Sequence, residues 1–458
     1  MQHSLLYAKS LSLLLEEVQS SSDLTAVRSS LLRVRRFSRS HGLSLELTES
    51  RLTVDGERLQ RPVPALHRLT MAMSVNGVRQ IDVSAGAVPQ ELLKLALLLA
   101  RKRSNDGETA TIFEDLRDAS LWCVQLYPVP RIILAEHSET YKADVALTAP
   151  EAIASRVKTL IEAAAAALRS DDITALAASL ATLAMVESGV EKPALRAPWT
   201  AAFDQAATID ALRALVVALP TCGQAIGNAT AVLKRAGDAG ADVLIDRLQK
   251  SDSLDVRRSC FDALTEVRRG TAQLLKMLDH EQWYVVRNAV CLLGVFNSRS
   301  SEPELTATLT HDDERVRAAV ITALLQLDTP AARATVRGAI RDGSPEVRRR
   351  AVRGFLSEAG SKANVDKLLF ALERETELDV QIEFLYALGS LATSDAVQKL
   401  IRLCSVDGQY RPADFRIAAA EALASARMGA AVPLLRSMLR DPDIHARAAA
   451  RHLIRAVS

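Results

Sequence analysis

The sequence predicts a mainly α-helical protein, in which a C-terminal α-solenoid of helical repeats follows a small N-terminal α+β domain. In the last half of the chain a Val-Arg pair, or a close variant, recurs at steps of 30, 30, 31, 33, 35 and 31 residues. A period of this size is typical of stacked units of two short helices, which bury their apolar faces only against neighbouring units. Aromatic residues make up only 4% of the 458 residues, while alanine and leucine dominate the second half, which favours close packing of helix on helix. The first 128 residues instead switch between helical periodicity and a period of two.

The N-terminal segment, residues 1–128, is predicted to be an α+β domain with about four strands. Apolar and polar residues alternate over 43–47 and again over 51–54, and the turn between them indicates a β-hairpin. Further strands are expected at 78–83 and 122–127. Apolar stripes at helical spacing predict helices at 5–18, 24–40, 63–75, 90–102 and 112–117.

The rest of the chain is predicted to be helical after a linker at 129–149. Residues 150–239 carry either degenerate repeats or a separate bundle, with an irregular stretch at 191–199 that holds two prolines. Residues 240–458 are expected to hold about seven regular repeats. Their second helices should begin near Asp252, Gln282, Asp312, Ser344, Glu377, Pro412 and Asp443.

The repeated arginine is predicted to be structural. In the segment from Asp312 to Val320, acidic residues open the helix, where carboxylates cap free N–H groups and meet the positive end of the helix dipole. Arg317 follows within the first turns, so stacking should place it beside the capping carboxylates of an adjacent repeat. Gln381 replaces this arginine in the fifth repeat, where we expect an irregular rung. The predicted ladder comprises Arg257, Arg317, Arg416 and Arg447.

The motif Asp-x-x-x-Val-Arg-x-Ala-x-x-x-Leu recurs in phase over about residues 240–458. In this it resembles the HEAT-repeat family, in the bacterial form close to the phycobilisome-lyase-type repeats. The run Trp283-Tyr-Val-Val-Arg-Asn and the N-terminal block around Leu52-Thr-Val-Asp-Gly also look like large uncharacterised bacterial HEAT-repeat proteins. The resemblance implies a solenoid fold and names no activity.

The composition argues against several classes of function. A net charge of +2 and a pI near 8.3 are too balanced to indicate a nucleic-acid or membrane partner by themselves. The N-terminus lacks a signal-peptide pattern and no uncharged apolar run approaches about 20 residues, so a soluble, cytoplasmic protein is expected. Neither the eight histidines nor the five scattered cysteines show metal-ligand spacing, and no nucleotide-binding or hydrolase motif is present. We therefore expect no catalytic residues, no metal and no cofactor.

Two groups of side chains are candidates for binding. Trp283 and Tyr284 lie beside Arg287, and these three residue types anchor many protein interfaces, although a tryptophan here could also fill the gap between two repeats. Arg348 and Arg349 could add a positive stripe, although surface arginines are common. The preferred function is a non-enzymatic scaffold that binds another protein on the solenoid surface. One alternative is nucleic-acid binding of the kind seen in HEAT-like DNA glycosylases, favoured by local arginine clusters and opposed by the near-neutral charge. The other is a bilin-lyase-like chaperone, which only the repeat resemblance supports.

Overall fold

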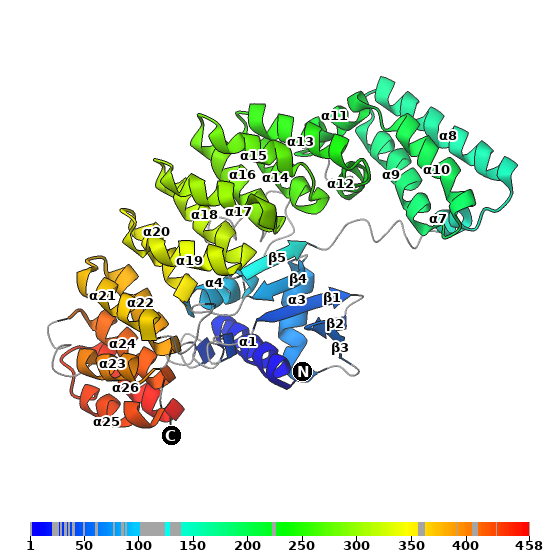
Figure 1. The fold of residues 1–458 in the computed structure, drawn as a ribbon. Helices are drawn as coiled ribbons and strands as arrows, with labels where there is room; N and C mark the ends of the chain where they lie inside the picture. Colours follow the sequence, from blue (N-terminus) through cyan, green and yellow to red (C-terminus); the bar gives the residue numbers. More distant parts are fainter. Residues whose placement is uncertain are drawn as a thin grey trace. The chain divides into compact units, whose positions relative to one another are not determined.

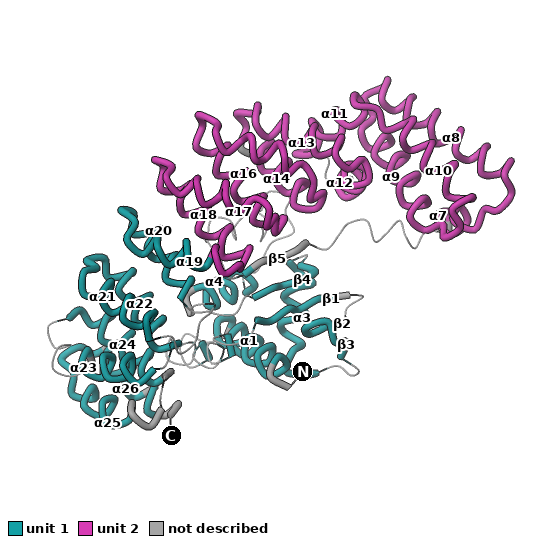
Figure 2. The backbone as a smooth tube through the Cα atoms, in the orientation of Figure 1, with its two compact units in different colours: residues 1–129, 333–458 teal, residues 130–332 magenta. Residues whose placement is uncertain are grey.

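The computed structural model describes residues 2–20, 42–100 with short gaps, 124–128, 139–221, 226–355, 362–404 and 411–457 without 392 and 427, together with a few positions between 27 and 38. The chain divides into two compact units (Figure 2), which are described separately. One unit joins residues 1–129 to residues 333–458, and the other spans residues 130–332. The structure confirms the predicted fold class, because helical repeats form most of the chain and a small mixed domain lies at its beginning (Figure 1).

The N-terminal domain contains one antiparallel sheet of five described strands in the order β3-β2-β1-β4-β5. These strands are β1 (Leu43–Thr48), β2 (Arg51–Val54), β3 (Glu57–Arg58), β4 (Val78–Val83) and β5 (Val124–Pro128). The register pairs Leu45 with Val54 on one side and with Ile81 on the other. The predicted hairpin is therefore present, but the estimate of about four strands missed β3. A turn at Asp55 and Gly56, both with positive φ, folds β3 back onto β2.

Helices supply the other layer of this domain. They are α1 (Gln2–Ser20), η1 (Pro64–Leu66), α3 (His67–Val75) and α4 (Pro89–Ala100). Their apolar stripes and the inward side chains of the strands form one core, in which Leu11, Leu45, Leu69, Ile81 and Leu95 are all fully buried. The predicted helix at 112–117, and most of the one at 24–40, lie outside the described residues.

The unit of residues 130–332 is helical throughout its described part. Its α-helices are α7 (Glu139–Val145), α8 (Pro150–Arg169), α9 (Ile173–Gly189), α10 (Pro193–Ala206), α11 (Ile209–Ala218), α12 (Ile226–Arg235), α13 (Asp238–Lys250), α14 (Leu254–Val267), α15 (Thr271–Lys276), α16 (Trp283–Val295), α17 (Glu302–Ala307) and α18 (Glu314–Leu327). Short 3-10 turns η3 (Met277–Asp279), η4 (Arg299–Ser301) and η5 (Thr308–Thr310) flank α15 and α17.

Two segments predicted to be irregular contain helix. The predicted linker holds α7, which Asp144 fixes to α8 by accepting two hydrogen bonds from the Arg156 guanidinium, at 2.9 and 3.0 Å. The proline-containing stretch at 191–199 forms the start of α10, because Pro193 occupies the first turn, where a missing N–H costs nothing. Helix α12 then packs against α13 and α14, so residues 150–239 adjoin the regular repeats directly.

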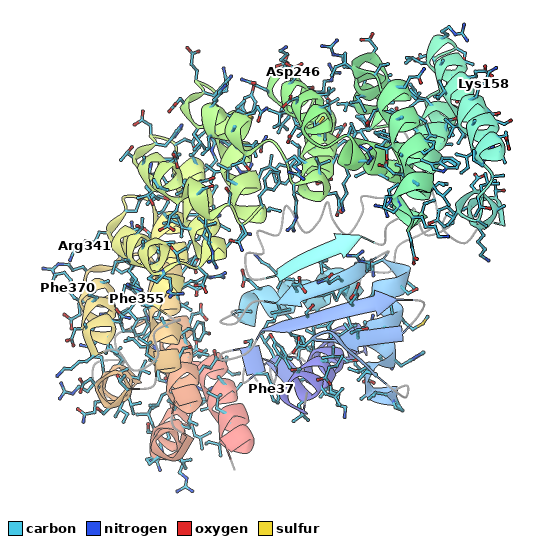
Figure 3. All side chains as sticks on the ribbon, turned by 45° about the vertical axis from the view of Figure 1, so that its right-hand side comes forward. Phe37, Lys158, Asp246, Arg341, Phe355 and Phe370 are labelled. Atoms are coloured by element: carbon cyan, nitrogen blue, oxygen red, sulfur yellow. The ribbon has the colours of Figure 1, made fainter. Side chains whose placement is uncertain are left out.

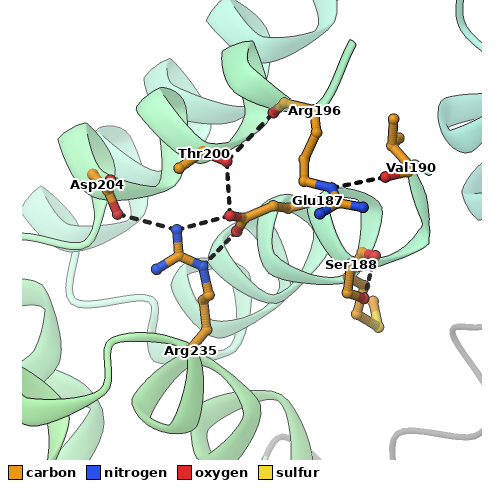
Figure 4. A network of polar contacts seen from close by, with 8 residues as sticks. Glu187, Ser188, Val190, Arg196, Thr200, Asp204 and Arg235 are labelled. Carbon is orange, nitrogen blue, oxygen red and sulfur yellow. Dashed lines mark hydrogen bonds and ion pairs between the residues drawn. The ribbon is translucent and has the colours of Figure 1, made fainter. Parts of the chain in front are cut away.

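A partly exposed polar network joins three helices of residues 150–239 (Figure 4). Glu187 on α9 accepts hydrogen bonds from Arg235 on α12 and from Thr200 on α10, the latter at 2.7 Å. Arg235 also reaches Asp204 at 3.2 Å and lies over the Phe203 ring at 4.6 Å. Burial alone would raise the pKa of Glu187, but the bonds from Arg235 and Thr200 dominate and lower it. This network fixes the packing of α9, α10 and α12 and leaves its polar atoms satisfied.

The repeats of residues 333–458 continue the same pattern. Their elements are α19 (Pro330–Gly338, begun three residues earlier), η6 (Ala339–Arg341), α20 (Pro345–Ala351), η7 (Val352–Phe355), α21 (Lys362–Arg374), α22 (Leu378–Leu391), α23 (Ser394–Cys404), α24 (Ala413–Ala426), α25 (Met428–Met438) and α26 (Ile444–Val457). Phe355 is fully buried, whereas Phe370 extends outward from α21 and is 48% exposed (Figure 3). Within this unit Arg353 of η7 forms an ion pair of 2.8 Å with Glu91 of α4.

Candidate functional site

In six repeats of the described part of the chain, the loop before the second helix is closed in the same way. A polar side chain in the loop accepts a hydrogen bond from the backbone N–H two residues further on, at 2.8–3.2 Å. This bond satisfies one of the N–H groups that the start of a helix leaves without a partner. The loop-capping residues are Ser251, His280, His311, Asp342, Glu375 and Asp441.

The repeated arginine binds the carbonyl groups of the same loop. Arg317 donates from Nη1 to the carbonyl oxygens of His311 and Asp312, at 2.9 and 2.8 Å. Arg257, Arg348 and Arg447 make the equivalent pair of bonds in their own loops. Gln381 reaches one such carbonyl, that of Glu375, so the substitution keeps part of the contact. We call this position of the second helix the rung position.

The rung arginines Arg348 and Arg416 also bind a carboxylate of the next repeat. Arg348 forms a bidentate ion pair with Glu375, at 2.7 and 2.8 Å, and the Glu375 side chain is only 3% exposed. Arg416 pairs with Asp441 in the same way, at 2.9 and 2.6 Å. In both cases the carboxylate is the loop cap of the following repeat. Arg257 instead faces a ring, because its guanidinium lies 4.8 Å from the centre of Tyr284.

Helix α16 departs from this pattern by one residue. The second helices of three consecutive repeats are equally long when measured from the N-terminal cap to the left-handed residue that ends the helix. This distance is fifteen residues from Ser253 to Arg268, from Gln282 to Asn297 and from Asp313 to Asp328. Arg257 and Arg317 stand four residues after their caps, whereas Arg287 stands five after Gln282.

The rung position of α16 is therefore filled by Val286, which is fully buried. One residue of α-helix corresponds to a rotation of about 100°. Arg287 is turned away from its loop by that amount and is exposed. The repeat that looks regular in the sequence thus has an apolar rung and an arginine that points to another face.

Rings and guanidinium groups meet at the start of α16. Trp283 and Tyr284 are half-buried and pack edge to face, with ring centres 6.1 Å apart. The Arg315 guanidinium of the next repeat lies 3.4 Å from the centre of the Trp283 ring, and that of Arg257 covers Tyr284. Such cation–π contacts stabilise the packing of adjacent repeats and fix the orientation of the rings. We name Arg257, Trp283, Tyr284, Arg287 and Arg315 the ring–guanidinium surface.

Asp313 fixes the position of Arg315 on this surface. Its carboxylate caps α18 by accepting from the Arg315 N–H at 2.8 Å, and it also accepts from the Arg315 guanidinium at 2.6 and 3.0 Å. The guanidinium bond is the main reason why the pKa of Asp313 falls to about 2. Arg315 is consequently held over Trp283 although its side chain is 56% exposed.

Arg348 and Arg349, the other predicted binding residues, belong to the unit that contains residues 333–458. Their guanidinium groups already bind carboxylates, since Arg348 holds Glu375 and Arg349 holds Glu346 at 2.7–3.0 Å. Arg350 binds Glu346 as well. Burial would raise the pKa of Glu346, but the charges of Arg350 and Arg349 lower it. The predicted positive stripe is therefore largely neutralised by neighbouring acids.

Sequence reasoning picked out Trp283, Tyr284 and Arg287 but missed the roles of Arg257 and Arg315. It also placed the Val-Arg pair of α16 in phase with the other repeats. The signal for the true register was present in the polar residue at the C-terminal end of each helix. Asn297 at the end of α16 and Asp328 at the end of α18 both adopt the left-handed conformation.

Two further features bear on chemistry. In the described part of the chain, no group of three or more His, Cys, Asp or Glu side chains is placed to hold a metal ion. Burial raises the pKa of the Cys260 thiol to about 12, with a smaller opposing effect of Arg247, so this cysteine is a buried thiol and a poor nucleophile.

None of the helices that the structure describes combines the length and apolar character needed to cross a membrane.

Residues 271–354 match the family described as HEAT repeats. Among solved structures, Kap121p is 14% identical with a TM-score of 0.43, covering 97% of this chain and 53% of Kap121p. Kap121p bound to Nup53p is 12% identical with a TM-score of 0.38 over the same shares. Human deoxyhypusine hydroxylase in complex with glycerol is 18% identical with a TM-score of 0.24, covering 54% of this chain and 95% of that one. This chain spans about half the length of Kap121p. No curated protein matches the sequence.

Stacked pairs of helices with capped loops and repeated rung arginines define an α-solenoid. The match over 271–354 covers the repeats of α16, α18 and α20, so this part of the chain consists of HEAT repeats.

Proposed function

We propose that this protein is a scaffold that binds another protein through the ring–guanidinium surface. The observation that carries the proposal is the one-residue shift in α16, which buries Val286 at the rung position and presents Arg287 beside two half-buried rings. Tryptophan, tyrosine and arginine dominate the energetics of protein interfaces, because they supply large contact areas together with polar groups. Solenoids display such residues along a continuous surface.

The charge arrangement gives less support to nucleic-acid binding. A protein that holds a duplex needs several cationic side chains available for phosphates. The richest cluster, Arg348 to Arg353, has bonds to Glu375, Glu346 and Glu91. A phosphate would have to displace these carboxylates. No observation favours the bilin-lyase alternative.

Affinity capture with the full chain tests the proposal. The immobilised protein is incubated with nuclease-treated lysate of its source cells, and the retained proteins are identified by mass spectrometry. Trp283→Ala and Tyr284→Ala should remove proteins that the wild type retains. Phe370→Ala is the matched control, because Phe370 is also an exposed ring under an arginine, with Arg374 at 3.7 Å, but lies on α21.

The proposal fails if Trp283→Ala and Phe370→Ala give the same set of retained proteins as the wild type. It also fails if everything retained depends on nucleic acid and disappears with nuclease.

A further inference from the structure

Resting on the proposed function, we propose that Arg287 binds a carboxylate of the partner, so that the ring–guanidinium surface takes an acidic segment of another protein. The rung arginines of the neighbouring helices donate to loop carbonyls, as Arg257 and Arg317 do. Within the described residues no hydrogen bond or ion pair engages Arg287. Its planar guanidinium therefore keeps its donors for an external acceptor, and two of them match the two oxygens of a carboxylate.

The side chains beside Arg287 indicate which residue should stand next to the acidic residue in the partner segment. Tyr284 precedes it by three residues on α16, so the ring and the guanidinium lie on the same face of the helix. A partner carboxylate bound to Arg287 would be flanked by a side chain that packs on the half-buried Tyr284 ring. The segment should therefore combine an acidic residue with a neighbouring apolar or aromatic residue.

The charges around this surface also favour a partner segment that offers a single carboxylate over a polyanion. Arg315 is already bound to Asp313, and the exposed carboxylates Asp255 and Glu281 lie in the first turn of α14 and in the loop before α16. These acids would repel a polyanion that follows the whole surface, such as a nucleic-acid backbone. A single carboxylate at Arg287 is repelled less than such a polyanion, so salt should weaken its binding only modestly.

Two peptide pools of equal length provide the probe. Each peptide carries a central leucine or tyrosine, flanked by Glu in one pool and by Gln in the other. The immobilised full-length wild type should retain the Glu pool about tenfold more strongly than the Gln pool, since one charge-assisted bidentate bond separates them. Arg287→Gln should abolish this preference, and Arg287→Glu should reverse it, so that the Gln pool is retained more strongly than the Glu pool.

Arg349→Gln is the control, because Arg349 stands at the same helical position, five residues after the cap Ser344, but is bound to Glu346. It should keep the preference for Glu. Equal retention of the two pools by the wild type, or failure to retain either pool, would overturn the inference, as would a preference for Glu that survives in Arg287→Gln.

The two proposals fail separately. If Trp283→Ala removes the proteins captured from lysate but Arg287→Gln leaves both capture and pool preference unchanged, the surface binds protein but not through a carboxylate. If Trp283→Ala changes nothing, the proposed function itself is wrong.

Discussion

Helices α16 and α18 belong to adjacent repeats and have the same distance from the N-terminal cap to the left-handed residue at the end of the helix, yet they use the rung position differently. In α18 Arg317 occupies it and binds two loop carbonyls. In α16 Val286 occupies it, and Arg287 is exposed. One residue of register thus separates an arginine that stabilises its own loop from one that is available to a partner.

We infer from this comparison that an arginine of the repeat motif stabilises its own loop only when it stands four residues after the N-terminal cap of its helix. Arg348, Arg416 and Arg317 stand at rung positions and bind loop carbonyls, and Arg348 and Arg416 also bind a buried carboxylate, whereas Arg287 stands one residue beyond the rung position. Removal of a rung arginine should therefore cost more stability than removal of Arg287.

The largest effect is expected for Arg348→Ala. This change leaves the 3%-exposed Glu375 carboxylate without its ion-pair partner, and breaking a buried pair costs about 3–5 kcal/mol. Hydrogen exchange of the peptides that cover α20 and α22 should accelerate strongly, because it reports local opening of the repeats. An unchanged exchange rate would show that the rung contributes little.

Acidification should narrow the difference in stability between the wild type and Arg348→Ala. Burial acts to raise the pKa of Glu375, but bonds from Arg348 and from the N–H groups of Glu377 and Thr376 prevail and hold it below 4.5. A lowered pKa in the folded state gives stability that is complete above the unfolded pKa and is lost as pH falls through the folded value. Wild type and Arg348→Ala should therefore differ most near neutral pH and converge below about pH 4.5. A difference that grows on acidification would contradict this sign.

An intermediate effect is expected for Arg317→Ala. The variant loses two charge-assisted bonds to carbonyls that can rebind water in part, so the cost should be about 1–3 kcal/mol. Melting curves and hydrogen exchange of α18 measure it. A cost no larger than that of Arg287→Ala would show that the bonds of Arg317 to the loop carbonyls do not stabilise the repeat.

The smallest effect concerns the electrostatics around Arg315. The pKa of Asp313, about 2 in the wild type, should return toward 3.8 in Arg315→Ala, because the guanidinium bond is the main cause of the lowering. Carboxyl chemical shifts in an NMR titration follow this directly. Arg287→Ala should leave the Asp313 titration unchanged, since no contact joins the two residues among those described.

Much of the architecture was predictable from the sequence. The period near 31 residues located the second helices, and the alternation at 43–54 located the hairpin, because both patterns reflect burial along regular elements. The turn at Asp55 and Gly56 also creates β3, which is too short for a periodic signal. Helix in the predicted linker was missed because α7 has only seven residues.

The candidate surface was only half predictable. Trp283, Tyr284 and Arg287 stand out by residue type, but the guanidinium groups over the two rings come from adjacent repeats. Such contacts depend on how repeats stack, which a motif within one repeat does not encode. The register of α16 was hidden because Val286-Arg287 matches the motif by chance one residue late.

The most direct test measures thermal stability and partner capture side by side in Arg287→Ala and Arg317→Ala. We predict that Arg287→Ala keeps the wild-type melting temperature, with a change below about 0.5 kcal/mol as for other surface substitutions, and loses the captured proteins. Arg317→Ala should melt earlier and retain them below its transition. If Arg287→Ala destabilises the protein as much as Arg317→Ala, or captures the same proteins as the wild type, the division between structural and binding arginines is wrong.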